Sequence, residues 1–165
     1  MYSVNEKIHY GGSGICVIQD ISTMRFGRSR EQYYVLKPVY QNASVIYVPV
    51  NSEQLVSKMR PVLTREEVEA LISCMNEIPT AWEEDPTARK ASFEAMLRSN
   101  ECRSLISLIK TLKLYREERL AEGKNLPVVE DTYLREAQRL LYDEFAEALD
   151  LRPDQVHDYI QSKLI

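Results

Sequence analysis

The chain has 165 residues, a mass of 19.2 kDa and a formal net charge of -4, which suits one large domain or two small ones. With 44% hydrophobic and 28% charged residues, its composition is typical of a folded globular protein and excludes a disordered or collagen-like chain. Three scattered cysteines and two histidines are too few for a disulfide framework, a zinc cluster or a histidine-assisted nucleophile, so we expect no metal and no cofactor.

The first sixty residues predict short strands separated by turns. Their density of β-branched and aromatic residues favours a small, strongly bent antiparallel sheet or barrel. Gly11-Gly12-Ser13-Gly14 predicts a turn with positive φ and not a phosphate loop, because it lacks the G-K-[ST] ending and a strand follows it. Strands are expected at 7–10, 15–21, 32–37 and 44–50, with a loop rich in Arg and Gly at 25–30.

After Pro61 the sequence predicts helices. Thr64 and Glu67 form a capping-box pattern, and this first helix should end before Pro79. Asp85 and Pro86 have the residue types of an N-cap and a first helical position. Further helices are expected at about 100–122, from about 131 onward, and after Pro153 around 156–160. The predicted fold class is α+β, a small bent antiparallel β module followed by an all-helical bundle of about five helices.

No catalytic constellation is apparent. The carboxylates at 83–85 are adjacent in sequence and so point in different directions, and they have no His or Cys nearby. Asp85 as an N-cap with two solvated glutamates is the stronger interpretation. We therefore expect neither an enzyme nor a small-molecule substrate.

We also expect neither a membrane span nor a secretory signal. No stretch approaches the roughly 18 consecutive apolar residues of a membrane span, and the segment 1–7 has no apolar core of a secretory signal. We expect a cytoplasmic monomer without membrane contact.

The aromatic residues allow two interpretations each. Five tyrosines of the predicted β module either form an aromatic cage or, more commonly, fill the core and support cross-strand pairs: Tyr10, Tyr33, Tyr34, Tyr40 and Tyr47. Trp82, the only tryptophan, lies between Pro79 and Pro86. It is either a plug between the two modules or an exposed wedge that stacks beside a base.

Positive charge concentrates in the middle of the chain, where residues 89–124 carry nine Lys/Arg against five Asp/Glu. Arg103, Lys110 and Lys113 are spaced by seven and three, so they share one helix face suited to phosphate contacts that position a protein without reading sequence. A solvated helix face explains the same pattern.

Two blocks of sequence resemble a known family. The segment 7–51 resembles the RNA polymerase-interacting domain of the CarD family, which also occurs in transcription-repair coupling factors. The helical part resembles the C-terminal domain of that family, especially its Firmicutes form. The residues that carry this second resemblance are 78–85 (IPTAWEED), Arg89-Lys90, 109–112 (IKTL) and 118–124 (ERLAEGK).

The resemblance implies a Tudor-like, polymerase-interacting β domain at 1–60 that binds the RNA polymerase β subunit. It also implies a helical domain at 61–165 that meets promoter DNA, mostly without sequence specificity. In the family a tryptophan wedges into the minor groove at the upstream edge of the transcription bubble and helps to hold the open complex, and Trp82 matches it by position. The expected polymerase contacts are Met24, Arg25, Val45, Ile46, Tyr47 and Pro49. The expected DNA contacts are Trp82, Arg89, Lys90, Arg103, Lys110 and Lys113.

The sequence departs from the family at two places. Tyr47 stands where actinobacterial members have arginine, so polar contacts to polymerase should differ, although backbone pairing would survive. Glu83, Glu84 and Asp85 follow Trp82 where some relatives are basic, which should weaken phosphate attraction there.

Two other functions remain as alternatives. One is a stand-alone polymerase-binding module without productive DNA contact. The other takes 145–160 as a helix-turn-helix, but its second helix carries Asp154 and Asp158 and is poorly suited to the major groove.

Overall fold

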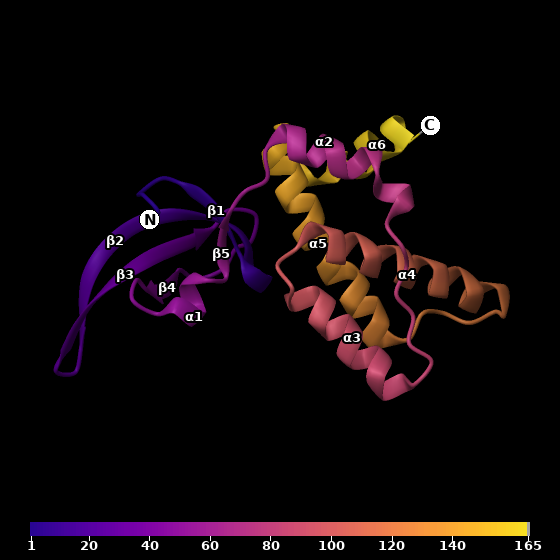
Figure 1. Cartoon of the computed structure of the whole chain (residues 1–165), viewed down its shortest axis with the longest axis horizontal. Helices are drawn as coiled ribbons and strands as arrows, with labels where there is room; N and C mark the ends of the chain where they lie inside the picture. Colours follow the sequence, from indigo (N-terminus) through magenta and orange to yellow (C-terminus); the bar gives the residue numbers. More distant parts are fainter. Residues whose placement is uncertain (165) are drawn as a thin grey trace. The chain divides into compact units, whose positions relative to one another are not determined.

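A computed structural model describes residues 1–164, with the backbone alone for Phe26. The chain forms two units, Met1–Leu63 and a second that begins at Thr64 (Figure 1). The first is built on one sheet and the second on helices, so the predicted α+β fold class is confirmed.

The first unit contains a five-stranded antiparallel sheet with the strand order β4-β3-β2-β1-β5. The strands are β1 (Lys7–Tyr10), β2 (Gly14–Phe26), β3 (Ser29–Pro38), β4 (Ile46–Pro49) and β5 (Met59–Pro61), with the short helix α1 (Glu53–Val56) before β5. Its core consists of Ile8, Cys16, Ile18, Tyr34, Leu36, Val48 and Met59. Along β4, the exposed Tyr47 is followed by the fully buried Val48, as expected for a strand with one buried face.

The glycine-rich segment is the predicted turn. A single 3-10 turn, η1 (Gly11–Ser13), joins the antiparallel strands β1 and β2, with φ of +42° at Gly11 and +74° at Gly14. Both values lie where side chains are disfavoured, which explains the glycines.

The predicted loop at 25–30 is wrong. β2 and β3 continue through it and pair Arg25 with Arg30 and Phe26 with Ser29, leaving a two-residue turn at Gly27-Arg28. Figure 1 shows the long hairpin that β2 and β3 form. Gly27 has φ of +65°, and a glycine at the first central position favours a tight hairpin turn whose twist matches the strands. The strand predicted at 44–50 is shorter, and β5 and α1 were not predicted.

Beyond the short strands, β2 and β3 form a two-stranded ribbon. β1 pairs with β2 only at Gly14 to Val17, and β4 pairs with β3 only at Tyr33 to Leu36. The paired residues from Ser22 to Gln32 therefore have no further strand beside them.

The second unit, as far as residue 164, contains five α-helices. They are α2 (Arg65–Ser73), α3 (Pro86–Arg98), α4 (Cys102–Ala121), α5 (Val128–Leu149) and α6 (Pro153–Leu164), with a 3-10 turn η2 (Met75–Glu77) after α2. The Thr64–Glu67 capping box is present, and the Asp85 carboxylate accepts a hydrogen bond from the Ala88 N–H at 2.9 Å. Both predicted helix starts are thus confirmed.

Two helix boundaries differ from prediction. α5 begins at Val128, three residues before the expected start, because Pro127 serves as its N-cap and its carbonyl accepts from the Asp131 N–H at 2.9 Å. Val128 is 82% exposed and Val129 49%, so the apolar residues of this first turn lie outside the buried face whose spacing predicts the rest of the helix. α2 ends at Ser73, and η2 replaces its last predicted turn.

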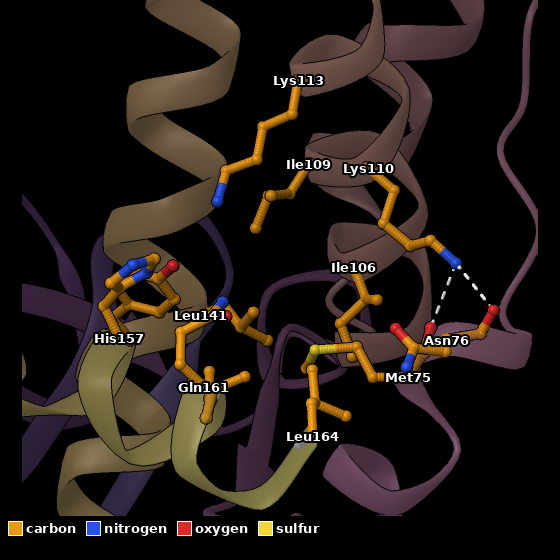
Figure 2. A pocket seen from close by; sticks show the side chains of 12 residues that line it. Met75, Asn76, Ile106, Ile109, Lys110, Lys113, Leu141, His157, Gln161 and Leu164 are labelled. Atoms are coloured by element: carbon orange, nitrogen blue, oxygen red, sulfur yellow. Dashed lines mark hydrogen bonds between the residues drawn. The ribbon is translucent and has the colours of Figure 1, made fainter.

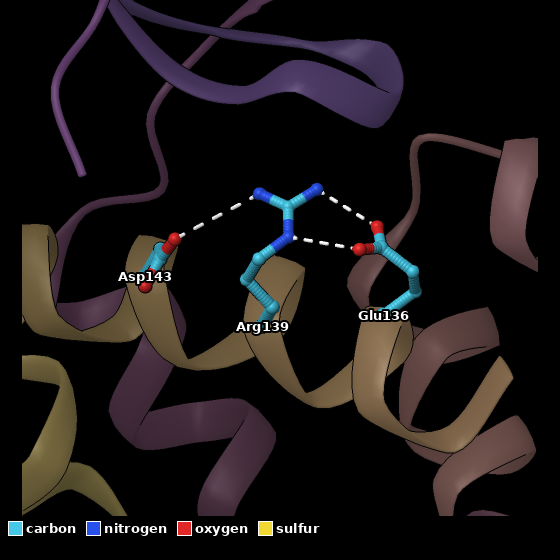
Figure 3. Close-up of polar contacts among 3 residues, drawn as sticks. All are labelled: Glu136, Arg139 and Asp143. Carbon is cyan, nitrogen blue, oxygen red and sulfur yellow. Dashed lines mark hydrogen bonds and ion pairs between the residues drawn. The ribbon is translucent and has the colours of Figure 1, made fainter. Parts of the chain in front are cut away.

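Buried polar groups on α5 are paired. Arg139 contacts Glu136 at 2.8 Å and Asp143 at 4.0 Å (Figure 3). Glu144, which is fully buried, accepts a hydrogen bond from the Cys102 thiol at 3.2 Å. The second contact links α5 to the first turn of α4. Within the described residues, no helix combines the length and apolar character that crossing a membrane requires.

Candidate functional site

The outer strand β4 carries three of the six predicted polymerase contacts, and Val45 directly precedes it. β4 lies at one edge of the sheet and pairs only with β3. Tyr47 is 46% exposed, whereas the neighbouring Val48 is fully buried. Ile46 packs against the core, and Val45 precedes the strand and is half-buried. Tyr47 is therefore the residue of this group whose side chain is most available to a partner.

The backbone of Tyr47 also faces away from β3. The Val50 N–H donates to the Gln32 carbonyl at 2.9 Å, so by antiparallel alternation Val48 is also hydrogen-bonded to β3, while Tyr47 and Pro49 are not. Pro49 has no N–H, and its carbonyl accepts from the Ser52 N–H at 3.1 Å. Tyr47 thus offers the outward backbone donor and acceptor of β4 to an added strand.

Met24 and Arg25 lie on the β2–β3 ribbon. Met24 pairs with Glu31 and Arg25 with Arg30, and Arg28 occupies the turn between them. All three arginines are exposed. Like charges placed directly across an antiparallel pair are destabilising, so the ribbon end gains from an acidic partner.

The tyrosines of the first unit differ in their surroundings. Tyr34 lies in the core with 3% exposed, and Tyr10 packs against the same core. Tyr47 is on the surface. The core interpretation is confirmed for the first two.

Trp82 lies in the helical unit between η2 and α3. It is 39% exposed. Its ring packs on Tyr115 of α4 with centroids 4.8 Å apart and near Phe93 of α3 at 6.3 Å. Part of the ring is held by the bundle and part is open to a partner, which is the arrangement that an aromatic wedge needs.

Arg89 covers part of this ring. Its Cζ atom lies 4.4 Å from the ring centroid of Trp82, within the range of a cation–π contact. A guanidinium nitrogen also donates to the carbonyls of Glu83 and Glu84 at 3.2 and 3.4 Å.

The other predicted DNA contacts occupy different environments. Lys90 is exposed on α3, and Arg103 is exposed on α4, where it donates to the Cys74 sulfur at 3.8 Å. Lys113 is half-buried, and burial, followed by the nearby charge of Arg116, lowers the pKa of its ammonium group. Lys110 is bound to backbone carbonyls (Figure 2). The predicted basic face of α4 is therefore not one uniform cationic surface.

Two of the cavities on the helical unit involve predicted DNA contacts. One, of about 120 Å3, is lined by apolar residues of α4, α5 and α6 together with Lys113 and His157 (Figure 2). The other, of about 330 Å3, lies beside Trp82 and includes Tyr115, Glu84 and Glu118. The two carboxylates make the second cavity unsuited to a phosphate group.

The Trp82 cluster continues to α5 through Phe93 and Tyr133, whose ring centroids are 6.3 Å apart. The Tyr133 hydroxyl donates to the Glu94 carboxylate at 2.8 Å. Burial, then this hydrogen bond and the charge of Glu94, raise the pKa of Tyr133 to about 12.

This shift predicts alkaline sensitivity. The pKa of the folded state lies above the ordinary value of about 10, so the contribution of Tyr133 to the free energy of unfolding is complete below about pH 10 and is lost as pH rises towards about 12. In urea titrations at pH 8, 10 and 11, the wild type should lose stability over this range more steeply than Tyr133→Phe. Parallel curves for the two proteins would contradict the assignment.

Comparison with known families finds a match for the first unit. Residues 2–63 match the CarD-like/TRCF RID domain. The N-terminal unit is therefore similar to the domains of this family, and we refer to it below as the RID domain. Domains of the RID family interact with the β subunit of RNA polymerase and are protein-interaction modules without catalytic activity. A search of curated proteins finds no match for the chain.

The RID domain includes all six residues expected to contact polymerase, from Met24 to Pro49. The contacts around Arg89 and Lys110 involve partners on other elements, and the sequence alone did not reveal them. For Lys110, the signal in the sequence was the run of Ser, Lys and Thr on one face of α4, which is also typical of a solvated surface.

Proposed function

We propose that this chain is a bacterial transcription regulator that bridges RNA polymerase and promoter DNA in the cytoplasm. The RID domain binds the β subunit through the β4 edge and the β2–β3 ribbon. The helical unit places Trp82 at the upstream edge of the transcription bubble and stabilises the open complex. The match of residues 2–63 to the RID family carries this proposal, because it indicates interaction with RNA polymerase.

The chemistry around Trp82 supports the DNA half of the proposal. Trp82 is half-exposed and packs against the ring of Tyr115. Such a ring can stack on a base or enter the minor groove, and stacking needs no base-specific hydrogen bond. Lys90 and Arg103 are exposed cations suited to phosphate contacts that orient the duplex.

A second candidate function is polymerase binding without productive DNA contact. The exposed carboxylates of Glu83, Glu84 and Asp85 favour it, because they repel phosphates next to the wedge. A helix-turn-helix at α5–α6 is less suitable, since Asp154 and Asp158 are exposed on α6 and no compensating cluster of cations lies there.

The lifetime of promoter complexes distinguishes the two candidates. Open complexes of a cognate polymerase are formed with and without the full chain, challenged with a competitor, and sampled over time. Base stacking is worth about 1–3 kcal/mol, which corresponds to a factor of about 5 to 150. We expect the chain to lengthen the lifetime of the open complex by up to this factor. Polymerase binding with an unchanged lifetime would favour the second candidate.

A further inference from the structure

One face of α4 holds the segment that leads to Trp82. Ser107, Lys110 and Thr111 are spaced by three and one, so they lie on the same side of the helix. All three side chains bond to the backbone of the segment from Met75 to Ala81. We call these three residues the α4 clamp.

Lys110 binds the backbone carbonyls in and just after η2. Its ammonium group donates to the carbonyls of Met75 at 3.1 Å, Asn76 at 3.2 Å and Ile78 (Figure 2 shows the first two). A lysine ammonium has three N–H donors, and three carbonyls accept from this one. A cation is also favoured at carbonyls that end a helical turn. Lys110 consequently has no donor left for a phosphate while this arrangement persists.

Ser107 and Thr111 fix the residues just before Trp82. The Ser107 hydroxyl donates to the Pro79 carbonyl at 2.7 Å, and the Ala81 N–H donates to the Thr111 hydroxyl at 2.9 Å. Thr111 is 3% exposed, so water competes little for this bond. The backbone is therefore held up to the residue that precedes the ring.

Arg89 fixes the ring and the residues after it. Its guanidinium group stacks on Trp82 at 4.4 Å and donates to the carbonyls of Glu83 and Glu84. Arg89 thus contacts the residues that follow Trp82 in the chain, whereas the α4 clamp contacts those that precede it.

We propose that Lys110 and Arg89 are positioning residues that hold Trp82 ready for its partner, and that they are not phosphate contacts. The importance of this for DNA rests on the proposed function. The physical reason is preorganisation: a ring whose loop is already ordered loses less conformational freedom when it binds. Transfer of either cation to a phosphate would release the carbonyls that it now satisfies, and would undo the presentation of the ring.

The free protein provides the first test, because Trp82 is the only tryptophan and its fluorescence reports on this loop alone. The full-length variants Lys110→Met and Arg89→Met are compared with Lys90→Gln, which removes a neighbouring exposed charge. Fluorescence anisotropy and acrylamide quenching should show about a 2- to 5-fold larger population of released ring in Arg89→Met, and at least as large a change in Lys110→Met. Lys90→Gln should match the wild type.

Binding of the same variants to duplex DNA provides the second test. A lost phosphate contact reduces the slope of log affinity on log salt by about 0.9. We expect this reduction for Lys90→Gln and an unchanged slope for Lys110→Met. Wild-type tryptophan signals in Arg89→Met and Lys110→Met, or a slope reduced by about 0.9 in Lys110→Met, would overturn the proposal.

Thr111→Val keeps the shape of the side chain and removes the contact to Ala81, so it tests the clamp even if Lys110→Met fails to fold. It should raise the released population of Trp82 as well, and a wild-type signal would count against the clamp. The fluorescence measurement needs no DNA or polymerase. If Trp82 proves irrelevant to promoter complexes, the proposed function fails. The fluorescence result then still decides whether Lys110 and Arg89 position the ring.

Discussion

Trp82→Ala should shorten the lifetime of promoter open complexes by about 5- to 150-fold and leave polymerase binding unchanged. Base–aromatic stacking is worth about 1–3 kcal/mol by alanine substitution, and this loss falls on the step at which the duplex opens. In the proposed function, recruitment depends on the RID domain at residues 2–63, and Trp82 lies outside this domain. The measurements are a competitor-challenge assay for lifetime and a pull-down of polymerase by the full chain.

Two controls separate a wedge from a structural ring. Trp82 is 39% exposed, so its removal should cost less than the about 3–5 kcal/mol of a fully buried ring. Phe93→Ala should reach that cost, because Phe93 is 1% exposed and supports Trp82 from α3. If Trp82→Ala melts as early as Phe93→Ala and has a normal complex lifetime per folded molecule, the tryptophan is structural and the wedge is disproved.

Replacing Val45 and Tyr47 by glutamate should abolish capture of polymerase. Tyr47 combines an exposed side chain with outward backbone groups, and Val45 lies just before the same strand. Truncation or reversal at the centre of an interface typically costs at least about 2 kcal/mol, which weakens binding on the order of 30-fold or more. A pull-down with the purified full chain, or a titration with the β subunit, measures the loss.

A proline at position 47 isolates the backbone contribution. Tyr47→Pro removes an N–H that does not pair with β3, so the sheet should persist while an added strand loses a bond. Tyr47→Phe keeps the ring and the backbone and should bind nearly as well as the wild type. Circular dichroism checks the fold of each variant. If the double glutamate variant bound polymerase as well as the wild type does, β4 would not be part of the interface.

Local sequence signals predicted the element starts that depend on local chemistry. The capping box at Thr64, the N-cap at Asp85 and the glycine turn after Tyr10 each require a particular residue type at a particular backbone position. The ribbon at 25–30 was missed because arginine and glycine are common in loops, and the pairing that makes it a strand comes from the opposite side of the hairpin.

The candidate site was only partly accessible from sequence. Trp82 was recognisable as the only tryptophan, placed between two prolines, and its half-exposed ring is consistent with a residue that contacts a partner. The partners of Lys110 lie 32 to 35 residues earlier in the chain, and helical spacing predicts a face but not what covers it. Charge alone therefore could not distinguish a cation that binds carbonyls from one that awaits a phosphate.

The β2–β3 ribbon has a consequence for hydrogen exchange. Two paired strands without a third neighbour have little stability of their own, so the end of the hairpin can open without disturbing the sheet. Amide protons near Arg25 and Arg30 will exchange through these local openings, whereas those of Ile18 and Leu36, which are fully buried in the core, require a far larger opening. A partner that settles on the ribbon must order it, and the resulting protection of its amides would mark the contact without any substitution.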